Sequence, residues 1–381
     1  MEGYARLKHG NFLNFKAHEL AYRNADLTFR HVLIPHATGY SVTTEWRVRY
    51  AINSWGLRDR EYALAKPPGT LRILALGDSH VEGYGVNIED TFVKRFEAAL
   101  NHGGAQANPP VTYEVINGGI SGYSPLLEYL LLSRKGLQWQ PDAVLLFYNF
   151  SDIRDDYEYE QMTKFDANGL PVQCFPFKRV RAHGDHPVER FLSRYSRAFL
   201  LLEHKVNVFF WHRWYPDFAK ASSVDLFVAF RGSPEQIAEL WKHNERYLDL
   251  IHQLLRARGI PMILISYPDA VEIDPNEWAE GRLASSFAVG QVLAQPLVVS
   301  HLANFAKDRG ILFLNLYEDF KATRLRPLYF KFDGHLNAQG HRVLADALFR
   351  RLVGPDGAAP ELFKGKRGQV GLYRKRGQVL Q

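Results

Sequence analysis

Cysteine is almost absent from this sequence, and its scarcity excludes a disulfide scaffold. The 381 residues include one cysteine, Cys174, so no intrachain disulfide can form. Long apolar runs are also lacking, since none reaches the roughly 18 to 20 residues that span a bilayer. A signal peptide has a basic segment followed by an apolar one, and this pattern is absent from the N-terminus, Met-Glu-Gly-Tyr-Ala-Arg-Leu-Lys-His. We therefore expect a soluble chain of unassigned compartment, because a periplasmic or membrane-anchored protein without its leader would look the same.

Acidic residues are missing from the C-terminal end, and this absence accounts for the net charge of +6. Residues 364–381 contain no acid and these basic residues: Lys364, Lys366, Arg367, Arg374, Lys375 and Arg376. Without them, Lys plus Arg would equal the 41 Asp plus Glu, so the rest of the chain is formally neutral. We therefore expect no nucleic-acid partner. The tail is either a solvated extension or a weak contact with an anionic surface.

Apolar runs and helical stretches alternate along the chain. Its 46% hydrophobic residues, with 25 Phe, 19 Tyr and 7 Trp, are enough for a sizeable core. Runs of about six Val, Ile and Leu residues without polar alternation are typical of strands buried on both faces of a parallel sheet. They occur at 71–76, 111–116, 143–148, 260–266 and 311–316. Helical stretches occupy 91–101, 125–137, 234–258, a segment ending near 308, and 338–352. The alternation predicts an α/β fold, a three-layer α/β/α sandwich with a mainly parallel five-stranded, flavodoxin-like sheet.

Two regions do not fit the alternation. Residues 1–66 are aromatic and basic, and we expect them to pack as an extension on a core domain of residues 67–353. Residues 154–232 form an insertion that carries Phe-Phe-Trp-His-Arg-Trp-Tyr from Phe209 onward. An insertion of this length above the strand ends is where a lid or an acceptor-binding surface would lie. Residues 354–381 form the basic tail.

Two motifs carry residues suited to nucleophilic catalysis. Gly77-Asp-Ser-His follows the first apolar run, so Ser79 stands at the end of a buried strand, before a helical stretch. Asp333-Gly-His lies in a polar loop before the last helix. A serine hydroxyl needs a base at neutral pH, and His335 supplies an imidazole whose tautomer Asp333 can fix. These residues predict a nucleophile, Ser79, with His335 as base and Asp333 as orienting carboxylate.

With Asn117-Gly-Gly-Ile-Ser-Gly-Tyr after the second run, these motifs resemble the GDSL or SGNH hydrolase family, which has this α/β/α fold. The resemblance covers about 71–153 and 233–352. It implies that the N–H groups of Ser79 and Gly122 bind the oxyanion, with Gly119 as the alternative register. The Asp-x-His spacing is similar to the variant in bacterial polysaccharide O-acetylation proteins. His80 resembles the serine-histidine form in SGNH domains attached to membrane acyltransferases.

The third motif departs from the family pattern Gly-x-Asn-Asp, whose asparagine is an oxyanion donor. Here the segment reads Tyr148-Asn-Phe-Ser-Asp, which puts Ser151 at the asparagine position when Asp152 is matched to the aspartate. Asn149 lies two residues earlier, on the same face if the strand continues. Asn149 and Ser151 are therefore both candidates for this donor. Loss of one donor would lower turnover roughly 100- to 1,000-fold.

The resemblance implies a serine esterase that cleaves a small acyl ester, an O-acetyl group on a carbohydrate, without metal or cofactor. An O-acyltransferase using the same residues, and a non-catalytic carbohydrate-binding module with a degraded oxyanion hole, are the alternatives. The expected partner is an acylated small molecule or polysaccharide, and the oligomeric state is not predicted. Candidates for substrate contacts are His80, Asp152, Asn53 and Arg58, the last two with a structural turn as the alternative. His183 and His186 lack further metal-ligand spacing.

Overall fold

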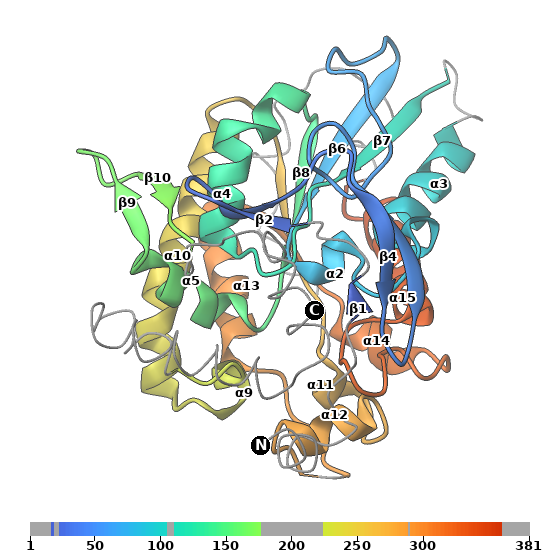
Figure 1. The fold of residues 1–381 in the computed structure, drawn as a ribbon, viewed down its shortest axis with the longest axis vertical. Coiled ribbons are helices and arrows are strands. Elements are labelled where there is room, and N and C mark those ends of the chain that lie inside the picture. Colours follow the sequence, from blue (N-terminus) through green and yellow to red (C-terminus); the bar gives the residue numbers. More distant parts are fainter. Residues whose placement is uncertain (1–16, 19–22, 105–109, 177–223, 289, 360–381) are drawn as a thin grey trace, which may run out of the picture.

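A five-stranded parallel sheet forms the centre of the protein (Figure 1). The computed structural model describes residues 17–18, 23–104, 110–176, 224–288 and 290–359. Every neighbouring pair of strands in the sheet is parallel. The predicted sheet is therefore confirmed, with one strand in each apolar run. Its order is β12 (Leu312–Asn315), β11 (Met262–Ser266), β8 (Ala143–Tyr148), β6 (Thr70–Leu76) and β7 (Thr112–Asn117).

Helices cover both faces of this sheet and give the three predicted layers (Figure 1). One face carries α3 (Phe92–Gly104) and α15 (Ala338–Leu352), with α14 (Tyr317–Ala322) against α15. The other face carries α4 (Pro125–Arg134), α10 (Pro234–Arg256) and α13 (Leu297–Arg309). The short helices are α2 (Ser79–Glu82), η1 (Ile88–Asp90), η2 (Gly136–Trp139), α11 (Ala270–Ile273) and α12 (Ala279–Ala284).

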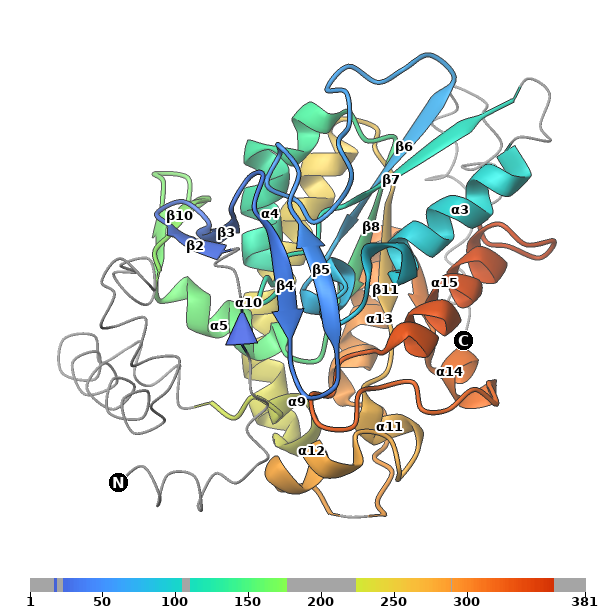
Figure 2. The same ribbon diagram turned by 45° about the vertical axis from the view of Figure 1, so that its right-hand side comes forward.

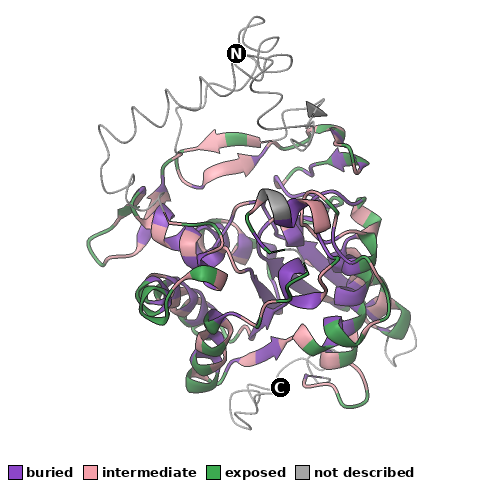
Figure 3. Ribbon diagram, turned by 90° about the horizontal axis from the view of Figure 1, so that it is seen from below, coloured by how far each residue is buried: buried purple, intermediate pink, exposed green. Residues whose placement is uncertain are grey.

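The strands are mostly apolar because each one contributes side chains to two cores. In β8, Val144 and Leu146 pack with the α4 and α10 side, whereas Leu145 and Phe147 pack with the α3 and α15 side. No strand face is left for water, so polar alternation is absent. Figure 3 shows the same distribution, with buried residues along the central strands and exposed ones on the outer helix faces. The predicted apolar stripe of α10 is buried at Ile237, Leu240, Trp241, Tyr247, Leu248, Ile251 and Leu255.

The N-terminal extension forms two small antiparallel sheets. One has the order β1 (Ala17–His18), β4 (Thr38–Val42), β5 (Arg47–Ala51), and the other pairs β2 (Arg23–Asp26) with β3 (Arg30–Leu33). Buried apolar residues of the extension belong to the same core as α4 and α10. In Figure 2, the tip of the β4–β5 hairpin lies beside the loop that leads into α15. The extension therefore reaches the carboxyl-end region of the core domain.

The region expected to be an insertion begins with ordinary secondary structure. Helix α5 (Asp152–Glu160) packs against α4 and α10, and a hairpin follows, β9 (Thr163–Phe165) with β10 (Pro171–Cys174). Helix α9 (Val228–Arg231) precedes α10. The aromatic stretch at Phe209, His183 and His186, and the tail from residue 360 lie outside the described residues. Within the described ranges, no helix is both long and apolar enough to cross a membrane.

Candidate active site

Ser79 stands at the carboxyl end of β6, as the first residue of α2. The turn before it is so tight that no side chain fits at position 77, which is glycine. A Cβ at Gly77 would lie 2.3 Å from Val81 Cγ2 and 3.2 Å from the Phe147 carbonyl oxygen. Ser79 is half-buried at the end of the sheet where open α/β proteins bind their ligands. Its hydroxyl is thus presented at the edge where a substrate would bind.

Three side chains form a hydrogen-bonded triad at this position. His335 Nε2 lies 2.7 Å from Ser79 Oγ, and His335 Nδ1 is hydrogen-bonded to Asp333 Oδ1. Because an ionised carboxylate can only accept, Nδ1 carries the proton and Nε2 accepts from the serine hydroxyl. The His335 side chain is 25% exposed and that of Asp333 only 6%. This arrangement can remove the Ser79 proton while the hydroxyl attacks an ester.

The two glycines considered for the oxyanion hole have different surroundings. Gly119 donates its N–H to Asn117 Oδ1 at 3.1 Å, and a Cβ on it would lie 2.3 Å from the backbone nitrogen of Glu82. Gly122 has a φ of +77°, and its carbonyl accepts from the Tyr159 hydroxyl at 2.9 Å. The Gly122 N–H meets no acceptor among the described residues. Gly119 is therefore a packing residue against α2, and Gly122 keeps an available donor.

Comparison with known proteins agrees with this geometry. Residues 75–343, which include Ser79 and the loop of Asp333 and His335, match the model of the GDSL-like lipase/acylhydrolase family. The match extends over more than half of the chain. The chain belongs to this family. The resemblance drawn from the sequence motifs is thereby confirmed.

Solved structures of family members and esterases resemble this one at low identity. A catalytic mutant of an acetylxylan esterase from Geobacillus stearothermophilus is 15% identical, with a TM-score of 0.38, over 74% of this chain and 93% of that one. A GDSL-like lipase from Bacteroides thetaiotaomicron is 12% identical, with a TM-score of 0.36, over 76% and 90%. A lipolytic G-D-S-L protein from Veillonella parvula is 13% identical, with a TM-score of 0.37, over 74% and 97%. No match was found among curated proteins.

The family's third motif is represented by Asn149 and Ser151 at the end of β8. The Asn149 side chain is held at both ends: Nδ2 donates to the Tyr267 hydroxyl at 3.1 Å, and Oδ1 accepts from the Ser151 N–H at 3.1 Å. One of the two N–H bonds of this amide remains available. Ser151 is half-buried at the start of α5, and its hydroxyl bonds to no described residue. The Asn149 amide is therefore the better fixed of the two candidate donors.

His80 lies against the base and not at the mouth of the site. It is 6% exposed, and its ring centroid is 4.8 Å from that of His335 and 5.4 Å from that of Tyr267. Burial, followed by the influence of His335, lowers the pKa of His80 well below its ordinary value. His80 is thus a buried imidazole packed against the His335 ring, and its role as a substrate contact stays a prediction.

Arg58 is also buried, and it bonds to backbone carbonyls. Its side chain is buried, and its guanidinium donates to the carbonyls of Glu82, Gly83 and Val86, with the last at 2.6 Å. The same group lies 3.7 Å from the ring centroid of Tyr50. The donors of Arg58 therefore hold the segment that follows α2. These bonds engage both terminal nitrogens of the guanidinium, as the structural alternative expects.

Asn53 and Asp152 are likewise buried and bonded to the backbone. Asn53 Oδ1 accepts from the Leu57 N–H at 2.9 Å, and Nδ2 donates to the Arg60 carbonyl at 2.9 Å, so the side chain closes a turn. Asp152 is 1% exposed, and its Oδ2 accepts from the Asn149 N–H at 2.9 Å. Burial and nearby carboxylates raise the pKa of Asp152 well above its ordinary value. Both side chains lie inside the protein, and their role as substrate contacts stays a prediction.

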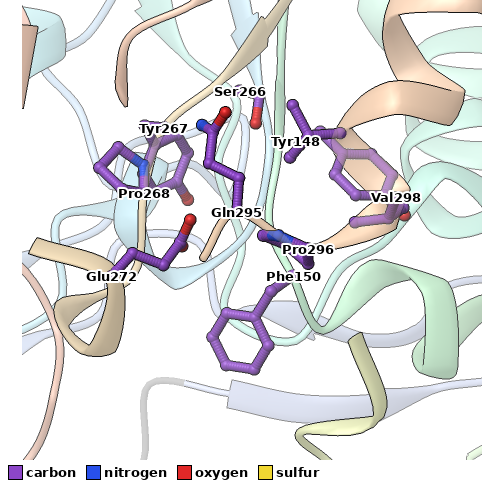
Figure 4. Close-up of a pocket in the computed structure, with 10 residues that line it drawn as sticks. Tyr148, Phe150, Ser266, Tyr267, Pro268, Glu272, Gln295, Pro296 and Val298 are labelled. Carbon is purple, nitrogen blue, oxygen red and sulfur yellow. The ribbon is translucent and has the colours of Figure 1, made fainter. Parts of the chain in front are cut away.

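A narrow cleft opens at the carboxyl ends of β8 and β11 (Figure 4). Its free volume is about 10 Å³, enough for about one water molecule. In Figure 4 the side chains of Ser266, Gln295 and Glu272 surround this space, with Tyr267 beside them. Burial raises the pKa of Glu272 to about 8, so this carboxyl group is protonated at neutral pH. The cleft is too small for an acyl group and its alcohol.

The extension supplies two site contacts that sequence reasoning missed. The Glu45 carboxylate accepts hydrogen bonds from the backbone of residues 331–333, and His31 Nε2 lies 2.9 Å from the Ser121 carbonyl oxygen. No local pattern in the sequence connects residues so far apart. Across the described part of the chain, no group of three or more His, Cys, Asp or Glu could hold a metal ion.

Proposed function

We propose that the protein is a serine esterase that cleaves a small acyl ester through an acyl-enzyme on Ser79. The observation that carries this proposal is the hydrogen-bonded triad, with Ser79 Oγ 2.7 Å from His335 Nε2 and Asp333 on Nδ1. Serine is a weak nucleophile without such a base, and imidazole transfers protons near neutral pH. Membership of the acylhydrolase family supports the same reaction class.

The reaction follows from the positions of these groups. His335 takes the Ser79 proton as Oγ attacks the carbonyl carbon, and Asp333 stabilises the imidazolium that forms. The N–H groups of Ser79 and Gly122 receive the oxyanion; within the described residues neither has an acceptor. Asn149 Nδ2 is the third donor. The intermediate expels the alcohol, which takes the proton from His335, and a water activated by the same base releases the acyl group.

The substrate we propose is an O-acetyl ester of a carbohydrate. The Asp333-Gly-His335 spacing is similar to that of bacterial polysaccharide O-acetylation proteins, and His80 after Ser79 resembles acyltransferase-linked domains of the family. An O-acyltransferase would use the same triad and differ only in the hydroxyl that resolves the acyl-enzyme. A non-catalytic binding module is disfavoured, because such a module has no need for a serine aligned with a base.

Labelling with a fluorophosphonate probe tests the nucleophile. The parent protein should be labelled and Ser79→Ala should not. Ser133→Ala is a matched control, because its hydroxyl only bonds the Leu130 carbonyl within α4. Equal labelling of Ser79→Ala and the parent, or an unlabelled parent, would refute the assignment. Acetate release from acetylated xylo-oligosaccharides then tests the substrate, and product analysis with an added sugar acceptor separates esterase from transferase.

A further inference from the structure

Glu45, in the turn between β4 and β5, binds the loop that carries the base. Its Oε1 accepts from the N–H of Lys331 at 2.6 Å and of Phe332 at 3.1 Å, and its Oε2 accepts from the N–H of Asp333 at 3.0 Å. Three successive backbone donors thus converge on one half-buried carboxylate. Hydrogen bonds to an ionised acceptor are the stronger kind. The third of these donors belongs to the residue that orients His335.

The bound segment is the tip of a turn whose base is closed separately. Tyr329 and Leu336 form an isolated antiparallel bridge, and the Phe330 N–H donates to the His335 carbonyl at 2.8 Å. These bonds close the turn where it leaves the core. The N–H groups of residues 331–333 lie at the tip of this turn, and all three donate to the Glu45 carboxylate.

A second contact from the same hairpin reaches the base through aromatic rings. The Trp46 ring packs on Phe330 at 4.6 Å between centroids and on Tyr84 at 5.4 Å. Tyr84 in turn lies 4.9 Å from the His335 ring. Gly85 permits this packing, because a Cβ there would lie 2.7 Å from Phe330 Cε2. The hairpin therefore touches both the backbone of the loop and the surroundings of its imidazole.

We propose that Glu45 is a positioning residue for the Asp333–His335 pair. The inference rests on the proposed function, because the position of the imidazole matters for rate only if Ser79 is the nucleophile. Glu45 fixes the backbone of Asp333, whose side chain fixes Nδ1 of His335. Displacement of reacting groups by about 1 Å can lower a rate about a hundredfold. Loss of Glu45 should therefore lower kcat and leave KM for a small ester nearly unchanged.

The test compares Glu45→Gln with Glu61→Gln. In Glu45→Gln the amide keeps one acceptor oxygen but presents N–H donors where Oε2 stood, so at least one backbone N–H loses its partner. Glu61 is a matched control in the same extension: its carboxylate accepts from the Ser54 N–H at 2.8 Å and is exposed. Hydrolysis of p-nitrophenyl acetate gives kcat and KM. Hydrogen exchange of peptides from residues 329–337 reports the loop independently of activity.

We expect kcat of Glu45→Gln to fall about tenfold to a hundredfold, with KM within about twofold and faster exchange in residues 329–337. Glu61→Gln should match the parent in all three measurements. An unchanged kcat in folded Glu45→Gln, or an equal loss in Glu61→Gln, would overturn the proposal. If the parent itself shows no Ser79-dependent turnover, the proposed function fails. In that case hydrogen exchange alone tests the contact: faster exchange of residues 329–337 in Glu45→Gln supports the proposal that Glu45 holds the loop, and unchanged exchange refutes it.

Discussion

Replacement of Asn149 by alanine gives the sharpest test of the oxyanion hole. The side chain makes two hydrogen bonds, one to the Tyr267 hydroxyl and one from the Ser151 N–H, each at 3.1 Å. Their loss should lower the free energy of unfolding by about 2 kcal/mol, at about 1 kcal/mol for each bond. The loss of an oxyanion donor should lower kcat roughly 100- to 1,000-fold, which corresponds to about 2.7 to 4 kcal/mol. The two effects are separable, because most of the protein stays folded at 25 °C.

The assay is kcat for p-nitrophenyl acetate hydrolysis, with the folded fraction taken from urea unfolding of each variant. Ser151→Ala is the paired variant, since the serine hydroxyl bonds to no described residue. We expect it to stay within about threefold of the parent, because no fixed donor is lost. A hundredfold loss in Ser151→Ala with a normal Asn149→Ala would transfer the donor role to Ser151. Normal turnover in both variants would show that no side chain of this motif contributes.

Two further predictions concern stability. Arg58→Met should lower the free energy of unfolding by about 3 to 5 kcal/mol in urea titrations, because several buried carbonyls lose their donor; a loss below about 1 kcal/mol would favour a substrate contact instead. Glu272 has its pKa raised to about 8 by burial, from 4.5, so the folded state keeps a proton that the unfolded state releases. Stability should thus fall as pH rises from about 4.5 to 8, by up to about 1.4 kcal/mol per unit. Glu272→Gln, which keeps an acceptor for the Asp269 N–H, should flatten that decline, and an identical slope in both proteins would contradict the reasoning.

The parts of the fold that the sequence predicted are those governed by local pattern. The run at 143–148 is apolar at every position because both faces of β8 are buried, and this property is visible without coordinates. Ser79 and His335 could be paired because a nucleophile and its base each follow a recognisable turn. The role of Arg58 could not be predicted, because the sequence shows that a guanidinium is present but not which backbone carbonyls surround it in the fold. Hydrogen-bond donors and acceptors that lie far apart in the chain show no sequence pattern that relates one to the other.

The choice between Asn149 and Ser151 shows the same limit on a smaller scale. Matching Asp152 to the family's aspartate puts Ser151 at the asparagine position, and spacing along one strand makes Asn149 an equal candidate. What distinguishes them is Tyr267, which follows the neighbouring strand β11 and accepts a hydrogen bond from the Asn149 amide. A fixed amide loses less conformational entropy on binding an oxyanion than a hydroxyl that is free to rotate. The contact that fixes the Asn149 amide therefore joins residues more than a hundred positions apart in sequence.

The extension contacts both halves of the proposed site, through Glu45 at the loop of the base and through His31 at Ser121. His31 Nε2 lies 2.9 Å from the carbonyl oxygen of Ser121, so it must carry the proton of that hydrogen bond. Burial, with Arg23 and Arg30, lowers the pKa of His31 to about 3, which keeps the ring neutral at physiological pH. The Ser121 carbonyl and the Gly122 N–H share one planar trans peptide, so they point in opposite directions. A bond that holds the carbonyl toward β3 therefore directs the proposed oxyanion donor away from the extension, while Glu45 fixes the loop of the base.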